Sequence, residues 1–466
     1  MPNNGLIRYL GLLNQERVLV TSPKALAEVL VTKNYHFEKP YQFRYSIGRI
    51  LGVGVLLAEG DEHKAQRKAL MPAFAFRHVK DLYSVFWSKS REGVQAMTQQ
   101  VLTDAAREPS YSDQADEKTP RDTAEMEVGS WASRVTLDII GIAGLGRDFG
   151  AIKDPENELN MTYQRLFKPS KQAQFLALLG MFIPGPILTL LPVKRNGDVA
   201  AAAAFIRSIC ADLIREKKEK LARKEPSDPD ILSVALESGG FSDENLIDQL
   251  MTFLAAGHET TASSMTWAIY MLCVNPEVQK RLREEVRSHL PSLDDDAATV
   301  SSLDIDHMPY LNAVVNEVLR YFGPVPVTVR EAACDTEILG QKIPKGTRIM
   351  LSPWAVNKSF ELWGPDALQF NPDRWLPKFD GDKTAASGGA QSNYAFMTFL
   401  HGPRSCIGMA FAKAEFACLL ASWIGRFEFE LKHKEEMIEA NVLIKGGVTA
   451  RPAKGLEVKV RVVDGW

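Results

Sequence analysis

The pattern of apolar and polar positions predicts helices along most of the chain and strands in a few short stretches. Residues 16–20 (ERVLV) predict a short strand, and Ser22-Pro23 then caps a predicted helix over residues 24–32. The other clear elements are helices over residues 277–286, 310–322 and 409–424 and a β-hairpin over residues 336–351. Together they predict a mainly α fold with small β-sheets.

The longest predicted helix runs from Ser242 to Asn275. Asp243 and Glu244 lie in its first turn, where the positive end of the helix dipole favours carboxylates. The helix is apolar on nearly all faces, which is typical of a helix that is buried in the centre of a large domain.

The middle of this helix breaks the apolar pattern. Residues 256–261 (AGHETT) place a glycine, a carboxylate and two β-branched hydroxyls inside the apolar cylinder. Glycine costs about 1 kcal/mol relative to alanine in a helix interior, and a buried carboxylate costs more unless it has a partner. Two hypotheses account for the break: a functional site, or a kink in which Thr260 bonds back to a carbonyl one turn earlier.

Residues 175–191 (FLALLGMFIPGPILTLL) come nearest to a membrane-spanning pattern. Pro184, Gly185 and Pro186 divide the segment, so it cannot form one continuous helix. We weigh two interpretations: two buried helix ends joined by a turn, or a patch that dips into a membrane surface. The amino-terminal residues contain no apolar run that is typical of a signal peptide or an anchor helix.

Composition describes a globular protein. The chain has 466 residues, of which 45% are apolar and 24% are charged, with a formal net charge of −3. Length alone allows roughly two to four domains. The charge is too close to zero for a nucleic-acid-binding protein, which needs a basic excess.

The five cysteines contain no Cys-x-x-Cys pair, which argues against a structural zinc site. Their odd number leaves at least one thiol unpaired, which indicates a reducing, intracellular compartment. Cys406 lies between turn-forming glycines at the start of a predicted helix, and Arg404 is a nearby cation. Both the helix dipole and the cation favour the thiolate. From these features alone, Cys406 is either a ligand or part of the core.

The amino-acid sequence around Cys406 is more specific than its position at a helix start. Phe399-x-x-Gly402-x-Arg404-x-Cys406-x-Gly408 resembles the haem-binding signature of the cytochrome P450 superfamily, and every fixed position is met.

Three further segments resemble the same family, in the family's order. These are residues 256–261, which are similar to its oxygen-activating stretch, Glu317-x-x-Arg320, and residues 371–375 (NPDRW). The resemblance extends from near residue 5 to the carboxyl end and is closest to eukaryotic, fungal members. It implies the cytochrome P450 fold, with residues 1–466 as a single haem-thiolate domain in place of two to four.

The resemblance also implies a cofactor, haem b, and a site for it. Cys406 would be the axial iron ligand, and Arg404 would pair with a haem propionate. The family often has a tryptophan where this chain has His63, so His63 keeps a donor but lacks the indole; by itself it would be a solvated histidine. The residues expected at the cofactor are Cys406, which is also the metal ligand, with Phe399, Gly402, Gly408, Arg404, Arg330, His63 and Arg67.

Glu317 and Arg320 are three residues apart and share one helix face. Alone, they would form a surface ion pair of little energetic value. By resemblance, they instead form a buried network with Arg374 that supports the cysteine loop.

Oxygen activation requires protons at the cofactor while bulk water is excluded. The resemblance makes Thr260 the first catalytic candidate and Glu259 the second, as a hydroxyl relay and a proton source, and Gly257 would leave room for O₂. The segments expected to contact an apolar substrate are residues 41–53, 251–255, 325–329 and 447–449.

The implied activity is that of a monooxygenase of secondary metabolism, which inserts one oxygen atom from O₂ into a hydrophobic small molecule. Gly52-Val53-Gly54 is a lone fragment of a dinucleotide fingerprint, so electrons must come from a separate NADPH-dependent reductase. The basic residues expected to bind it are Lys64, Lys68, Arg77 and Lys413. The cytoplasmic face of the endoplasmic reticulum is the compartment implied, with residues 175–191 as a peripheral membrane contact.

Two alternatives remain. An isomerase or dehydratase of the same fold would need no reductase, and a non-catalytic haem-binding protein would need neither a proton relay nor an apolar pocket. The pair Glu259-Thr260 argues against the isomerase.

Overall fold

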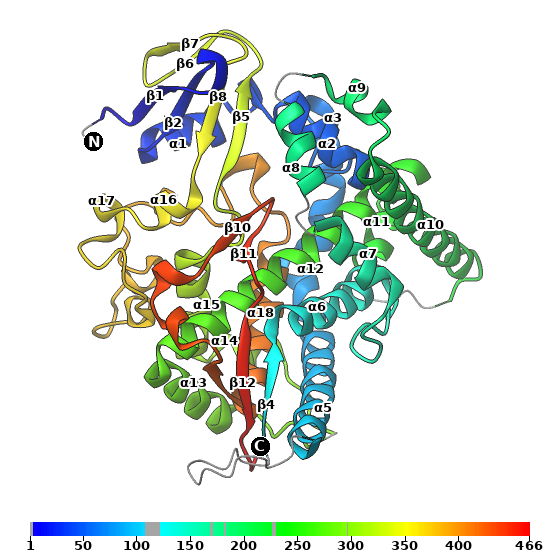
Figure 1. Cartoon of the computed structure of the whole chain (residues 1–466), viewed down its shortest axis with the longest axis vertical. Helices are drawn as coiled ribbons and strands as arrows, with labels where there is room; N and C mark the ends of the chain where they lie inside the picture. The colour runs from blue at the N-terminus through cyan, green and yellow to red at the C-terminus, as the bar shows by residue number, and fades with distance from the viewer. Residues whose placement is uncertain (1–2, 108–121, 168–170, 181–182, 226–229, 296) are drawn as a thin grey trace.

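The structure is a computed structural model that describes residues 3–107, 122–167, 171–180, 183–225, 230–295 and 297–466. Helices form most of it, as Figure 1 shows, and the described residues also form four small sheets. The expected mainly α fold with small sheets is therefore confirmed.

The helices surround a large apolar core. Their bounds in the described ranges are α1 Pro23–Ala27, α2 Tyr41–Leu51, α3 Gly60–Leu70, α4 Phe76–Asp81, α5 Tyr83–Arg107, α6 Val128–Leu145, α7 Glu158–Phe167, α8 Lys171–Leu179, α9 Gly185–Leu190, α10 Lys194–Ala222, α11 Ile231–Glu237, α12 Asp243–Val274, α13 Pro276–His289, α14 Ser302–Asp306, α15 Pro309–Tyr321, α16 Pro353–Asn357, α17 Phe360–Trp363 and α18 Met409–Arg426.

The strands pair over short registers. Their bounds are β1 Leu6–Leu10, β2 Glu16–Val20, β3 Phe37–Glu38, β4 Thr123–Glu127, β5 Thr328–Ala332, β6 Thr336–Ile338, β7 Gln341–Ile343, β8 Arg348–Leu351, β9 Phe427–Leu431, β10 Ile444–Gly446, β11 Ala450–Pro452 and β12 Glu457–Val462. The largest sheet has the order β1-β2-β8-β5-β3 and covers a second, smaller apolar core. The others are β4-β12-β9, β10-β11 and β6-β7.

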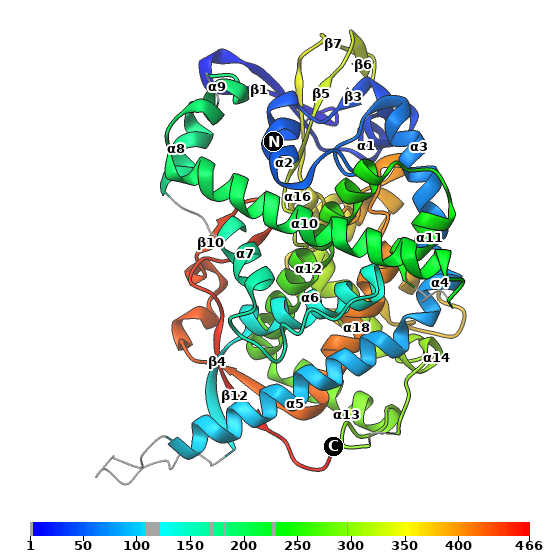
Figure 2. The same ribbon diagram turned by 90° about the vertical axis from the view of Figure 1, so that its right-hand side faces the viewer.

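Helix α12 crosses the centre of the molecule (Figure 1) and packs against α6, α10, α15 and α18. Its N-cap is Ser242, whose side chain accepts the N–H of Asn245 at 3.2 Å. Figure 2 shows α10 lying across this helix. The predicted helix over residues 242–275 is thus confirmed, and its apolar faces are explained by neighbours on all sides.

The prediction for residues 336–351 is confirmed only in its first half. Strands β6 and β7 form the hairpin, with Thr336 opposite Ile343. Strand β8 instead pairs with β2 and β5 in the largest sheet. Residues 24–32 are helical as predicted, but the second half, Glu28–Thr32, is a π-helix.

The interpretation of residues 175–191 as buried helix ends is wrong. The segment forms two short helices, α8 and α9, and residues 181–182 lie outside the described part. Phe175 and Leu178 are each 53% exposed, Ile187 is 54% exposed and Leu190 is 82% exposed. Nothing in the described chain covers this apolar surface. Among the described residues, no helix has the length and apolarity required to cross a membrane.

Candidate active site

The cysteine loop is closed by backbone hydrogen bonds immediately before α18. The N–H of Cys406 donates to the carbonyl of Phe399 at 2.8 Å, and the N–H of Ser405 donates to that of Gly402 at 3.0 Å. The Cys406 side chain is exposed. Surrounding protein raises the pKa of its thiol, while the Gly408 N–H and the Arg67 charge act in the opposite direction.

Gly402 and Gly408 of the cysteine loop differ in whether the surrounding protein leaves room for a side chain. Gly402 has φ +75°, and a Cβ there would lie 2.1 Å from the carbonyl oxygen of Leu30. A side chain at Gly408 would meet Phe74 at an ordinary 3.6 Å. Gly402 therefore allows the loop to contact the backbone of the π-helix, whereas no protein atom requires a glycine at position 408.

Arg67 holds the cysteine loop from α3. Its guanidinium donates to the carbonyl of Ser405 at 2.6 Å and to the hydroxyl of Ser405 at 3.2 Å. The expectation that Arg67 lies at the cofactor site is supported by this contact, because Ser405 is next to Cys406.

Four charged residues whose side chains are largely shielded from solvent form a cluster beside the loop, which we call the Glu59 cluster: Lys39, Glu59, Arg330 and Arg404. Arg404 forms an ion pair with Glu59. Lys39 lies with its Nζ 3.9 Å from the Glu59 carboxylate, which also accepts the Lys39 backbone N–H at 2.9 Å. Burial and the charge of Arg330 lower the pKa of Lys39 to about 7. Burial and Arg404 lower the pKa of Arg330 to about 10.

His63 is buried next to the same cluster. It is 2% exposed, so the interpretation of His63 as a solvated histidine is wrong. Its Nδ1 lies 3.2 Å from the Tyr35 hydroxyl. Burial, followed by the charges of Arg404 and Lys39, lowers the pKa of His63 to about 4, so the imidazole is neutral at pH 7.

The charges of the Glu59 cluster fit a haem. With Lys39 protonated, three cations and one carboxylate leave two positive charges in this site, and a haem carries two propionates. Within the described residues, the Nε of Arg404 has no hydrogen-bond partner. A buried unpaired donor is costly, and an anionic ligand would remove that cost. The structure thus brings Arg404, Arg330 and His63 together as expected, and it adds Lys39, Glu59 and Tyr35.

A second set of polar groups lies on α12. Ala256 is exposed and Gly257 and Thr260 are half-buried, although most of their neighbours on this central helix are buried. A Cβ at Gly257 would lie 2.8 Å from Ile140 of α6, so packing against α6 accounts for this glycine. The resemblance predicts that this exposed strip of α12 faces the distal side of the cofactor.

Thr260 donates its hydroxyl proton to the carbonyl of Ala256 at 2.8 Å. This is the back-bond of the kink hypothesis, and α12 is assigned as one helix through it. The Oγ1 lone pairs of Thr260 point away from this bond and can accept a proton.

Glu259 is not bonded to Thr260. Its carboxylate forms an ion pair with Arg451 at 2.6 Å and accepts the hydroxyl of Thr449 at 2.9 Å. These contacts connect α12 to the start of β11. Sequence reasoning missed Arg451, because its partner lies far away in the sequence.

Glu415 on α18 is a further buried acid that the motifs did not indicate. Thr261, next to Thr260, donates to its carboxyl at 2.9 Å. Burial raises the pKa of Glu415 to about 8, so the group is protonated at neutral pH.

The predicted network of Glu317, Arg320 and Arg374 is present and buried. Arg320 donates to the two Glu317 oxygens at 2.8 and 2.7 Å, and Arg374 donates to one of them at 3.2 Å. We call this set, with the Trp375 indole and the Asn371 N–H that also donate to Glu317, the Glu317 network. It is not the surface ion pair of the alternative interpretation.

The Glu317 network reaches the cysteine loop through Asn357. Arg320 donates to the Asn357 carbonyl at 2.8 Å, and the Asn357 side chain bonds the Met397 N–H at 2.7 Å and the Thr398 hydroxyl at 2.9 Å. Phe399 of the cysteine loop follows directly. The network therefore fixes the chain that leads into the loop.

Helix α12 also connects three of the segments expected at the substrate. The backbone of Val53 bonds its amino-terminal half, and Thr449 bonds Glu259. The N–H of Ala450 in turn donates to the carbonyl of Pro324 at 2.9 Å. Val53, Val327 and Val448 are exposed apolar side chains in these three segments.

Comparison with known proteins agrees with this site. The family model for Cytochrome P450 matches residues 4–460, and the chain belongs to that family. The chain is 49% identical over 470 residues to the cytochrome P450 monooxygenase sphH of Aspergillus fumigatus, over 100% of this chain and 82% of that protein. It is 47% identical to ALT8 of Alternaria alternata, over 99% of this chain and 84% of the relative. It is also 47% identical to FUM15 of Gibberella moniliformis, over 98% and 81% respectively.

All three relatives are fungal and are named cytochrome P450 monooxygenases. The chain is therefore an enzyme of this class, and membership implies a haem cofactor, O₂ and a redox partner.

Proposed function

We propose that this enzyme binds haem b and inserts one oxygen atom from O₂ into a hydrophobic small molecule of fungal secondary metabolism, with electrons from a separate NADPH-dependent reductase. The observation that carries the proposal is the Glu59 cluster, whose two excess positive charges lie beside an exposed thiol in a haem-binding signature. When bound, the haem activates O₂ for insertion, and electron donation by the thiolate favours O–O cleavage.

The residues of this chain have separate tasks in that reaction. Cys406 binds the iron, and Arg404, Arg330, Lys39 and the neutral His63 hold the propionates by charge and hydrogen bonds.

On the distal side, Thr260 accepts or passes a proton at Oγ1, since its own proton is already bonded to Ala256. Glu259 can hold a proton for Thr260 only after it releases Arg451. The apolar residues around the side of α12 that carries Thr260 exclude bulk water.

The isomerase alternative is weaker because the relatives are named monooxygenases. The non-catalytic alternative does not account for Thr260 and the apolar segments that α12 connects.

The test uses the purified holoenzyme. Reduction under carbon monoxide should give the red-shifted Soret band of a thiolate complex, and Cys406→Ser should lose it. Product should form only with a reductase and NADPH; turnover without an electron donor would favour the isomerase.

A Thr260→Ala variant separates proton delivery from folding. We expect product per NADPH to fall at least roughly tenfold, because a positioned acid–base group contributes about 10²–10⁴-fold, while NADPH consumption continues. Thr266→Ala is the matched control, because Thr266 makes the same back-bond to Ala262 at 2.8 Å in a buried part of α12. Full coupling in Thr260→Ala would refute the role of Thr260.

Two of the four expected basic residues remain the better candidates for binding the reductase. Lys68 and Arg77 are exposed. Lys64 is paired with Asp61 at 2.7 Å, and Lys413 is half-buried and donates to Asn316 at 2.7 Å. We therefore assign docking to Lys68 and Arg77, and expect Lys68→Glu to slow reduction more than Lys413→Gln.

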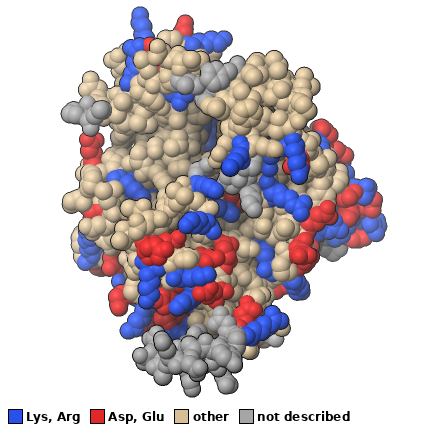
Figure 3. Space-filling view, viewed as in Figure 1, with Lys and Arg blue, Asp and Glu red and all other residues tan. Residues whose placement is uncertain are grey.

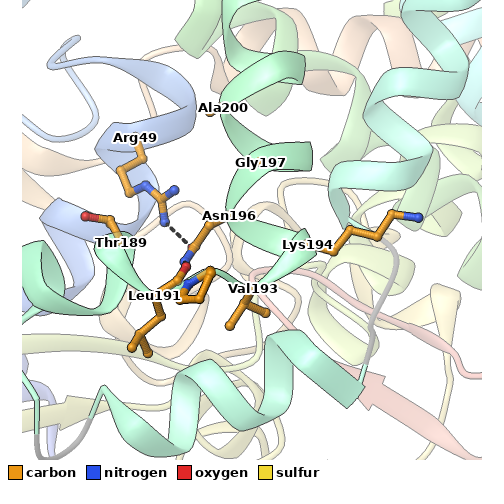
Figure 4. Close-up of a pocket in the computed structure, with 9 residues that line it drawn as sticks. Arg49, Thr189, Leu191, Val193, Lys194, Asn196, Gly197 and Ala200 are labelled. Atoms are coloured by element: carbon orange, nitrogen blue, oxygen red, sulfur yellow. Dashed lines mark hydrogen bonds between the residues drawn. The ribbon is translucent and has the colours of Figure 1, made fainter.

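The exposed apolar residues of α8 and α9 support the proposed peripheral membrane contact at the cytoplasmic face of the endoplasmic reticulum. Figure 3 shows few charged side chains over these helices, while both signs are dense in the lower half of the same view. A surface pocket of about 520 Å³ lies next to α9, between α2 and α10. Figure 4 shows Arg49 reaching across it to Asn196, with Leu191 and Val193 on its rim.

A vesicle of neutral and anionic phospholipid tests this contact. Ile187→Ser with Leu190→Ser should weaken co-sedimentation by roughly thirtyfold or more, because each exposed aliphatic side chain contributes about 1–2 kcal/mol when it enters lipid. Leu303→Ser, which removes an equally exposed leucine on α14, should leave binding unchanged. Equal loss in both variants would refute the assignment to α9.

A further inference from the structure

The Gly52–Val55 loop, which follows α2, lies on the amino-terminal half of α12. The N–H of Val53 donates to Oδ2 of Asp248 at 2.7 Å, and the N–H of Val55 donates to Oε1 of Gln249 at 2.8 Å. Gln249 is fully buried and also donates to Gln66 of α3 at 2.9 Å. The loop is thus fixed by two side chains of the central helix.

The two glycines of the loop are required by this contact. Gly52 has φ +68°, and a Cβ there would lie 2.0 Å from Oδ1 of Asp248. A Cβ at Gly54 would lie 2.5 Å from the Thr252 hydroxyl and 2.8 Å from the Asp248 carbonyl. Gly52-Val53-Gly54, which alone resembled a piece of a dinucleotide fingerprint, therefore serves close packing of the loop against α12.

Asp248 also binds α10. Arg207 donates to Oδ1 of Asp248 at 2.8 Å and forms a second ion pair with the exposed Glu244. One carboxylate thus uses one oxygen for the loop and the other for α10, the helix that lies across α12 in Figure 2. Its side chain is only 14% exposed, so both bonds are partly shielded from water and salt.

The position of Gln249 relates the loop to the distal face. Gln249 precedes Ala256 by seven residues and Thr260 by eleven. At 100° per residue all three share one side of α12, and Gln249 lies about 17 Å from Thr260 along the helix. This side of α12 carries Thr260 near the middle of the helix and Gln249 nearer the amino-terminal end. The loop therefore covers the amino-terminal end of this side, which we call its outer end.

We propose that Asp248 and Gln249 are positioning residues that hold the Gly52–Val55 loop over the outer end of this face and so limit the size of molecule that reaches the cofactor. This inference rests on the proposed function. Val53 exposes an apolar side chain at this point, so the molecules that pass the loop are apolar.

The test compares Asp248→Ala, which loses both bonds, with Asp248→Asn, which keeps an acceptor for Val53 but loses the charge that binds Arg207. Glu244→Gln is the matched control, because it removes the other carboxylate partner of Arg207 and does not contact the loop. Gln249→Met is an independent variant that removes the Val55 acceptor.

The first readout is amide hydrogen exchange of peptides covering residues 50–57. Loss of a charge-assisted hydrogen bond predicts roughly tenfold faster exchange in Asp248→Ala. Asp248→Asn should lie between Asp248→Ala and wild type, and Glu244→Gln should match wild type. Unchanged exchange in both Asp248→Ala and Gln249→Met would overturn the inference, whatever the outcome for the cofactor.

The second readout is the association rate of two iron-binding probes with the holoenzyme, imidazole and the bulkier 4-phenylimidazole. We expect Asp248→Ala to accelerate the bulky probe severalfold and imidazole by less than about twofold, because only the larger probe needs the loop to move. Equal acceleration of both probes would overturn the claim about size. Failure of imidazole, the small probe, to bind wild-type haem would instead contradict the proposed function.

Discussion

Two buried clusters of charged side chains support the cysteine loop, and they differ in how well their charges are balanced. In the Glu317 network, two guanidinium groups face two carboxylates, because Arg374 pairs with Asp366 at 2.9 Å as well as with Glu317. Arg320 forms a two-point ion pair with Glu317, and its remaining N–H groups donate to the carbonyls of Asn357, Ala367 and Gln369 at 2.8 Å each. In the Glu59 cluster, three cations share one carboxylate, and Arg404 retains an unpaired Nε.

This difference separates two uses of buried charge. Breaking a balanced pair leaves an uncompensated charge in the interior, so the Glu317 network contributes to folding. An unbalanced cluster raises the energy of the protein by itself, as the lowered pKa values of Lys39 and Arg330 indicate. Such a cluster is stabilised when an anion of matching charge binds.

The largest effect is expected from Glu317→Gln. The substitution keeps the size of the side chain but removes the only charge shared by two buried guanidinium groups, so the free energy of unfolding should fall by about 3–5 kcal/mol. Urea denaturation followed by circular dichroism measures it. Glu428→Gln, which breaks an exposed ion pair with Arg461, should cost less than about 1 kcal/mol. Similar losses of unfolding free energy in the two variants would mean that the buried Glu317 network contributes no more to stability than an exposed ion pair does.

A smaller effect of the opposite sign is expected from Lys39→Met. The haem-free chain should be as stable as wild type or more stable, because a buried, repelled cation is removed. The holoenzyme should release haem to apomyoglobin about tenfold faster, which is the loss of one charge-assisted hydrogen bond. The control is Lys68→Met, which removes an exposed lysine from α3. If Lys39→Met destabilised the haem-free chain and left haem release unchanged, the Glu59 cluster would stabilise the fold and would not bind the cofactor.

Glu415 tests a third case, a buried acid that is neutral. Its pKa is about 8 in the folded protein and 4.5 in an ordinary glutamate. Between these values the folded state holds a proton that the unfolded state lacks, so stability falls as pH rises from about 5 to 8, by up to about 1.4 kcal/mol per pH unit. Glu415→Gln should remove this contribution, and Glu428→Gln should retain it. Parallel pH profiles for Glu415→Gln and wild type would show that Glu415 is ionised.

Local sequence patterns predicted the elements whose environment is uniform. Strand β2 matches residues 16–20, and α12 begins and ends within one residue of the prediction, because a helix that is apolar on all sides must be buried. The same reasoning failed for residues 175–191. Apolarity shows that a segment avoids water, but it does not show whether protein or lipid covers it.

The resemblance to the family's motifs predicted the residues around Cys406, the Glu317 network, and Arg404 and Arg330 of the Glu59 cluster, but not Lys39 and Glu59. Lys39 and Glu59 are single charges in ordinary surroundings of the sequence, and only the fold brings them to Arg330 and Arg404. The partner of Glu259 was missed for the same reason, since Arg451 follows 192 residues later. Pairings between distant segments leave no local pattern.

The bond between Arg67 and Ser405 connects residues that are 338 positions apart. During synthesis at about 5–20 residues per second, the residues of α3 emerge from the ribosome tens of seconds before the cysteine loop exists. The pocket for the cofactor is therefore among the last parts of the molecule that can be completed, and a chain that terminates early cannot assemble it. A chain that ends before residue 405 therefore lacks the partner that Arg67 binds.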